Sequence, residues 1–119
     1  MIHPLKDRIA IRERYLRDNL TIRIGGLAAN LARVKSFSND YRHRDIVESL
    51  VEESKFFIEW AAPDAGPDLG STLAELQLQL ARWQLAWHTI WEDTAHRDRV
   101  GNEAQAWSTE LLRLAGLLR

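Results

Sequence analysis

Apolar residues recur at steps of three and four along four stretches of the chain, and this spacing predicts four amphipathic helices. The apolar stripes are Leu20, Ile24, Leu27, Leu31 and Val34; Ile46, Val47, Leu50, Val51, Phe57, Ile58 and Ala61; Leu73, Leu76, Leu80, Trp83, Trp87 and Ile90; and Val100, Ala104, Trp107, Leu111, Leu114 and Leu118. Turn-forming and capping residues collect between the stripes, at 36–40, 63–70 and 92–94. This arrangement predicts an all-α fold, an antiparallel up-and-down four-helix bundle formed by the single domain 1–119.

Residues that favour helix starts precede three of the four stretches. Asn39 or Asp40 suits the start of the second helix, and Asp93 or Thr94 suits that of the fourth. Thr72 is followed three positions later by a glutamate, which is a capping-box pattern, so we expect the third helix to begin there.

The first predicted helix is the longest, at about 30 residues or 45 Å. Gly25 and Gly26 lie inside it, and because glycine is unfavourable in a helix interior, either the helix kinks there or a neighbour packs closely; we favour close packing of another helix. The N-terminal turns of so long a helix would extend beyond shorter neighbours, with the line through Ile9, Leu16 and Leu20 facing the bundle. Alternatively, these turns fold back as a separate short helix that fills the gap.

Apolar residues also occur on faces opposite the predicted core stripes, which a helix of an isolated bundle does not need. They are Ile11, Tyr15 and Ile22 on the first helix, Phe56 and Trp60 on the second, and Leu78, Ala81, Leu85 and His88 on the third. These residues are the candidate interface, and the simplest partner is a second copy in a twofold homodimer. Another protein partner, or internal cover, is the alternative interpretation.

The composition fits one compact domain, with 45% hydrophobic and 28% charged residues in 119. There is no cysteine, so neither a disulfide nor a thiolate metal site can form. No stretch resembles a membrane span or a signal peptide, so we expect a cytoplasmic protein with no membrane partner.

The net charge of -1 conceals a strong segregation of charge. Residues 1–44 hold ten Lys or Arg against four Asp or Glu, residues 45–79 hold one against eight, and residues 80–119 hold five against five. We interpret this as two neighbouring helices with complementary charges. No aromatic pair accompanies the basic segment in a position where bases could stack, so no nucleic-acid partner is expected.

Candidate chemistry is sparse along the chain. His88, Glu92 and His96 have ligand-like spacing, but a helix break near Asp93 would separate His96 from the other two. No nucleophile elbow, phosphate loop or dinucleotide fingerprint occurs. We therefore expect a protein that is not an enzyme and has no metal or cofactor.

Five tryptophans are many for this length. Trp83, Trp87 and Trp107 are most simply core residues, whose indole N–H groups need partners such as Gln84, Ser54 or Ser108. An aromatic-lined pocket formed by the same three rings is the alternative. Two functional hypotheses follow: a small helical interaction or regulatory module that self-associates, and a binder of a flat, apolar, pigment-like ligand.

Three stretches carry an overall resemblance to known proteins. They are Val47 to Trp60, Leu76 to Trp91 and Trp107 to Leu118. In these stretches the chain resembles a group of short, all-helical proteins from cyanobacteria. The resemblance implies a bacterial, cytoplasmic origin and brings no activity with it.

Overall fold

The computed structural model describes residues 4–118, and that part of the chain is all-helical without a β-strand, which confirms the predicted all-α class. Its helices are α1 (Pro4–Arg17), α2 (Leu20–Phe37), α3 (Arg44–Ala61), α4 (Pro67–Leu85), α5 (Trp87–Glu92) and α6 (Thr94–Leu114). Two 3₁₀ turns, η1 (Tyr41–His43) and η2 (Ala62–Asp64), lie before and after α3.

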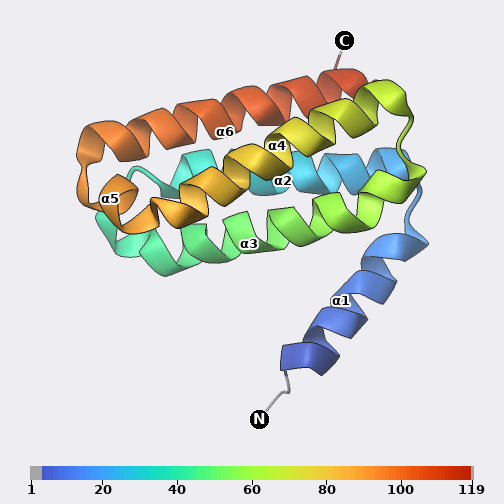
Figure 1. Cartoon of the computed structure of the whole chain (residues 1–119), viewed down its shortest axis with the longest axis horizontal. Coiled ribbons are helices and arrows are strands. Elements are labelled where there is room, and N and C mark those ends of the chain that lie inside the picture. The colour runs from blue at the N-terminus through green and yellow to red at the C-terminus, as the bar shows by residue number, and fades with distance from the viewer. Residues whose placement is uncertain (1–3, 119) are drawn as a thin grey trace.

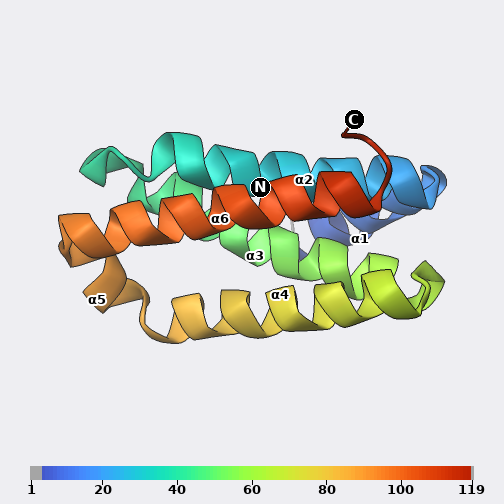
Figure 2. The same cartoon turned by 90° about the horizontal axis from the view of Figure 1, so that it is seen from above.

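The long helices α2, α3, α4 and α6 lie alongside one another, whereas α1 diverges from them (Figure 1). Helix α2 packs against both α3 and α6. Seen from above, α4 lies at the edge of the molecule, on the side away from α2 (Figure 2). The short helix α5 turns the chain from α4 into α6.

The predicted stripes form the core. Buried residues from all four stripes belong to one apolar cluster: Ile24, Leu27, Leu31, Val34, Val47, Val51, Ile58, Ala61, Leu73, Leu76, Leu80, Trp83, Trp87, Ile90, Val100, Ala104 and Leu111. Two stripe members, Ile46 and Leu118, are exposed instead. Helical periodicity therefore identified most of the core, because each helix buries a single face.

The contact between α2 and α6 depends on small residues. A Cβ atom added to Gly101 would lie 2.5 Å from the Ser38 hydroxyl oxygen, which only glycine avoids without a shift. Further along, the buried Ser108 hydroxyl donates a 2.7 Å hydrogen bond to the backbone oxygen of Ala28. The two helices are thus close enough for a side chain of one to bond the backbone of the other.

The prediction of one long first helix is wrong. The chain breaks at Asp18 and Asn19, and the Asn19 side chain caps α2 by accepting a 3.0 Å hydrogen bond from the Ile22 N–H. Asparagine favours this capping role over a helix interior, which explains the position of the break. Helix α2 runs without interruption through Gly25 and Gly26. A Cβ atom added to Gly25 would lie 3.3 Å from Leu117, in the segment after α6, and one added to Gly26 would lie 3.9 Å from the Tyr15 ring of α1, so the neighbours at this pair are that segment and one helix.

The break also reverses the two faces of α1. Tyr15 is 8% exposed and Ile11 is half-buried, whereas Ile9 is 48% exposed. On the line expected to face the bundle, Ile9 is therefore exposed, whereas Leu16 is half-buried. Because α1 is not continuous with α2, it can orient Tyr15 toward α3. A separate short helix at this end of the chain was the alternative prediction.

Other predicted boundaries differ by a few residues. Helix α4 begins at Pro67 rather than Thr72, because proline at the first helical position is favourable. The third predicted helix is interrupted at Ala86, between α4 and α5. Asp40 caps η1 rather than α3, and Asp93 caps α6 as predicted.

Candidate functional site: apolar interaction surfaces

The candidate interface residues lie in three separate places. Ile11, Tyr15, Phe56 and Trp60 meet where α1 packs on α3; Leu78, Ala81, Leu85 and His88 lie on α4 and the start of α5; and Ile22 stands by itself at the start of α2. Ile22 is 55% exposed. The candidate residues do not form one surface, because the chain breaks at residues 18–19 and at Ala86 change the direction of the faces.

Four aromatic rings join α1 to α3, and we call them the α1–α3 aromatic cluster: Tyr15, Phe56, Phe57 and Trp60. The Tyr15 ring stacks on Phe57 with 4.1 Å between the ring centroids, and Trp60 lies 6.0 Å from Tyr15. Trp60 also contacts Phe56 at 5.7 Å. Burial of aromatic rings stabilises such contacts, so within the chain Tyr15 is buried and Ile11, Phe56 and Trp60 are partly covered.

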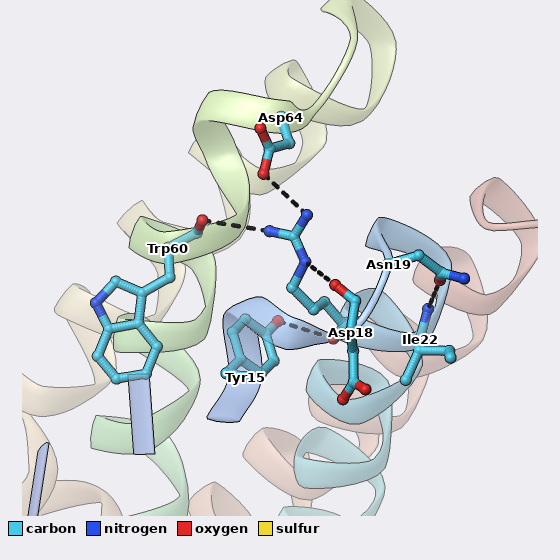
Figure 3. A network of polar contacts seen from close by, with 7 residues as sticks. Tyr15, Asp18, Asn19, Ile22, Trp60 and Asp64 are labelled. Atoms are coloured by element: carbon cyan, nitrogen blue, oxygen red, sulfur yellow. Dashed lines mark hydrogen bonds and ion pairs between the residues drawn. The ribbon is translucent and has the colours of Figure 1, made fainter. Parts of the chain in front are cut away.

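A buried arginine joins Asp18, the residue after α1, to Trp60 at the end of α3 and to Asp64 in η2, the three acceptors that are labelled in Figure 3. Arg23 is 6% exposed, and its guanidinium donates to the backbone oxygen of Asp18 at 3.1 Å and to Asp64 Oδ2 at 2.8 Å. A longer bond of 3.5 Å reaches the backbone oxygen of Trp60. Five N–H donors in a fixed plane allow one arginine to bond three segments at once.

The Tyr15 hydroxyl extends the same network by donating a 2.8 Å hydrogen bond to the backbone oxygen of Arg23. Burial raises the pKa of this hydroxyl well above its ordinary value, although the nearby guanidinium acts in the opposite direction. Tyr15 therefore keeps its proton in the folded chain under conditions that ionise an exposed tyrosine.

We expect alkaline pH to destabilise the natural chain more than its Tyr15→Phe variant. Above about pH 10 the unfolded chain loses the Tyr15 proton and the folded chain keeps it, so stability falls with rising pH. The measurement is urea unfolding of both proteins at about pH 9 and about pH 11. An equal loss of stability in the two proteins would show that Tyr15 does not carry the effect.

The outer face of α4 carries Leu85, the most exposed of the large candidate interface residues in the described chain, and we define the α4 face as Ala74, Leu78, Ala81 and Leu85. Leu78 is 52% exposed and Leu85 is 90% exposed. These two residues are seven positions apart, which places them on one line along the helix. Ala74 is exposed and Ala81 is half-buried, so the surface between the leucines is flat.

The three tryptophans of the alternative hypothesis do not line a common pocket among those described. Trp83 and Trp87 are 4% and 7% exposed and belong to the core. Trp87 borders a hollow of about 280 Å³ between α3 and α4, whereas Trp107 borders another, together with α4 and α6 residues. The buried indole N–H of Trp87 has no hydrogen-bond partner among the described residues.

A second buried arginine lies at the opposite end of the molecule from Arg23. Arg97 is 8% exposed and donates a 2.7 Å hydrogen bond to the backbone oxygen of Trp91. Its guanidinium carbon lies 5.5 Å from the ring centroids of both Tyr41 and Trp91. The Trp91 indole N–H donates to the backbone oxygen of Tyr41 at 2.8 Å, so this end is held by an aromatic and cationic cluster. None of the indole partners suggested by the sequence, Gln84, Ser54 and Ser108, bonds Trp91.

The charge segregation places opposite charges on α1 and α3. Helix α1 holds five basic and two acidic residues, a net +3, and α3 holds two basic and five acidic residues, a net -3. Arg8 lies 3.5 Å from Glu52 and 3.8 Å over the Phe56 ring. Both partners of this ion pair are about half exposed, so its contribution to stability is small.

No group of three metal-ligating side chains occurs within residues 7–118, and no helix of the described range has the length and apolarity needed to cross a bilayer. His88 lies on α5 and His96 on α6, on opposite sides of the Asp93 cap. Among family models, curated proteins and solved structures, none matches this chain.

Proposed function

We propose that the protein is a small, non-enzymatic helical interaction module that forms a homodimer through the α4 face. The observation that carries the proposal is the exposure of two leucines on one line of one helix, 52% at Leu78 and 90% at Leu85. A helix that packs only inside its own chain needs one apolar face, and α4 already has one in Leu73, Leu76, Leu80 and Trp83. The outer leucines are therefore available to a partner.

The arrangement of the α4 face favours a second copy as that partner. Two α4 helices that pair antiparallel about a twofold axis near Ala81 would bring Leu78 of each copy beside Leu85 of the other. This follows because the two leucines stand at nearly equal distances along the helix on either side of that point. Small residues at Ala74 and Ala81 let the two helices approach closely. A twofold interface is self-complementary, and this face meets that condition.

The proposed dimer also rests on an inference about topology. We infer that α2, α3, α4 and α6 form one antiparallel up-and-down bundle, with α1 as an additional helix outside it. Short connections between the helices support this inference, as does the single buried cluster to which all four contribute. In such a bundle each helix turns one face to the core, which leaves the α4 face to solvent or to a partner.

The test is the solution mass of the natural chain and of the variant Leu78→Glu with Leu85→Glu, by light scattering during size-exclusion chromatography. We expect the natural chain to be a dimer that weakens on dilution, and the variant to be a folded monomer, because carboxylates cannot be desolvated against leucine without a large cost. The variant should keep its helical circular dichroism, since neither leucine belongs to the core.

A matched control places the same two charges on another exposed helix surface. Gln105→Glu with Thr109→Glu adds two carboxylates to exposed positions of α6 and should leave the dimer intact. A natural chain that is monomeric at every concentration, or a leucine variant that remains dimeric, would refute the proposal.

A further inference from the structure

Helix α1 has a second line of residues, turned about 100° around the helix axis from the side with Arg8, Ile11 and Tyr15 that meets α3. Ile9 is 48% exposed, Arg12 is exposed and Leu16 is half-buried, and these residues follow one another at steps of three and four. We call them the outer face of α1. They combine two aliphatic side chains with a cation between them, on a helix of net charge +3.

Helix α3 has a matching uncovered surface near its N-terminus. A hollow of about 360 Å³, which we call the α3 groove, is lined by Asp45, Ile46, Ser49, Leu50 and Glu53. Ile46 is 44% exposed although the sequence pattern places it in an apolar stripe. The Asp45 and Glu53 carboxylates therefore flank an aliphatic floor, of which Ile46 is exposed and Leu50 is half-buried; Glu53 also accepts a 3.0 Å hydrogen bond from the Asn30 side chain.

The α3 groove continues into the space that α1 of the same chain occupies. Ser49 and Glu53 line both the α3 groove and the hollow of about 150 Å³ between α1 and α3. One wall of that second hollow is α1, a basic, amphipathic helix whose Arg8 guanidinium carbon lies 3.8 Å from the Phe56 ring centroid. The same side of α3 is thus next to a basic helix within the chain.

We propose that the outer face of α1 docks into the α3 groove of a second copy of the chain, and that the contact is reciprocal. Ile9 of each copy would pack on Ile46 and Leu50 of the other, and Arg12 would approach the Asp45 carboxylate. The opposite net charges of α1 and α3 support this pairing. Helix α1 and the α3 groove both border the surface around Ser49 and Glu53, so a single twofold axis could bury both pairs at once.

This second contact is independent of the α4 face, because it involves neither α4 nor α5. It is expected to be weaker, since it offers one half-exposed isoleucine from each side and ion pairs that salt screens. Covalent trapping is therefore a better measurement than mass. The absence of cysteine from the natural chain makes such trapping specific to the positions chosen.

The experiment mixes two single-cysteine variants, Ile9→Cys and Ile46→Cys, both in the Leu78→Glu and Leu85→Glu background, and oxidises the mixture at high protein concentration. We expect a disulfide-linked dimer whose peptide map joins position 9 to position 46. The control pair, Ile9→Cys with Thr109→Cys, should give little of this product, because Thr109 lies on α6. Since the α4 face is disabled in every sample, the result does not depend on the proposed dimer.

A charge exchange tests the specificity of the contact. Arg12→Glu should lower the yield of the 9–46 product about fivefold, the effect of about 1 kcal/mol at an exposed pair, and Asp45→Arg on the other chain should restore it. Equal yields from the experimental and control pairs would overturn the proposal. It would also be overturned if no linked dimer forms while the α1 cations bind phosphatidylserine vesicles or a DNA duplex instead.

Discussion

Replacing Trp91 with alanine is expected to lower the free energy of unfolding by about 3–5 kcal/mol, the usual cost of removing a buried aromatic ring. Trp91 is 1% exposed, and its ring centroid lies 5.5 Å from that of Trp87. Its indole N–H bonds the backbone oxygen of Tyr41, which joins α5 to the turn before α3. The substitution removes the ring, the hydrogen bond and part of the environment of the Arg97 cation together.

Thermal and urea denaturation followed by circular dichroism measure this effect. Trp91→Phe keeps most of the apolar contact but loses the indole donor, so we expect a smaller loss of about 1–3 kcal/mol. Ile22→Ala is the matched control for removal of a large apolar side chain, and it should change stability by less than about 0.5 kcal/mol because Ile22 is 55% exposed and lies outside the α4 face. A Trp91→Ala loss as small as that of Ile22→Ala would contradict the packing described for α5.

Replacing Arg23 with alanine is expected to cost about 2–4 kcal/mol and to loosen α1. The guanidinium satisfies backbone oxygens at the α1–α2 break and at the end of α3, and it pairs with Asp64. Without it, two acceptors near the α1–α3 aromatic cluster lose their donor. Arg23→Lys should recover only part of the loss, because one ammonium group does not reproduce the planar fork.

Two measurements separate loss of the guanidinium from a general weakening of the fold. Limited trypsin digestion should cut Arg23→Ala faster than the natural chain at Arg14 or Arg17, the basic residues in the last turn of α1. Asp64→Ala removes the exposed member of the ion pair, whose side chain is 57% accessible, and should cost less than about 1 kcal/mol. Equal effects of the Arg23 and Asp64 substitutions would show that the backbone contacts of Arg23 contribute little.

The sequence predicted the helical class and most of the core. Each helix buries one face, and this burial places apolar residues at steps of three and four that can be read from one sequence. It did not predict the break at residues 18–19. Asn19 favours a cap but is also compatible with an exposed helix position, and the helical spacing of the apolar residues before and after it does not decide between the two. The interruption at Ala86 has no glycine or proline to mark it.

The candidate surfaces were predicted only in part. Exposure of Leu78 and Leu85 follows from their place opposite the core stripe of α4. The two buried arginines were missed, although a signal was present: Arg23 stands four residues before Leu27, and Arg97 three residues before Val100, both on core-facing lines. A charged residue on an apolar stripe is a candidate for a buried cation, but its partners come from segments that sequence spacing does not connect.

The packing of α2 against α6 also affects how the chain folds during its synthesis. Ser108 bonds the backbone at Ala28 across 80 positions, so this face of α2 receives its partner only after α3, α4 and α5 have been made. Until then the side chains of Leu27, Leu31 and Val34, which are fully buried in the complete fold, remain partly exposed on the growing chain. Ribosome-bound chains that end before α6 should therefore recruit chaperones or aggregate more than the complete chain does.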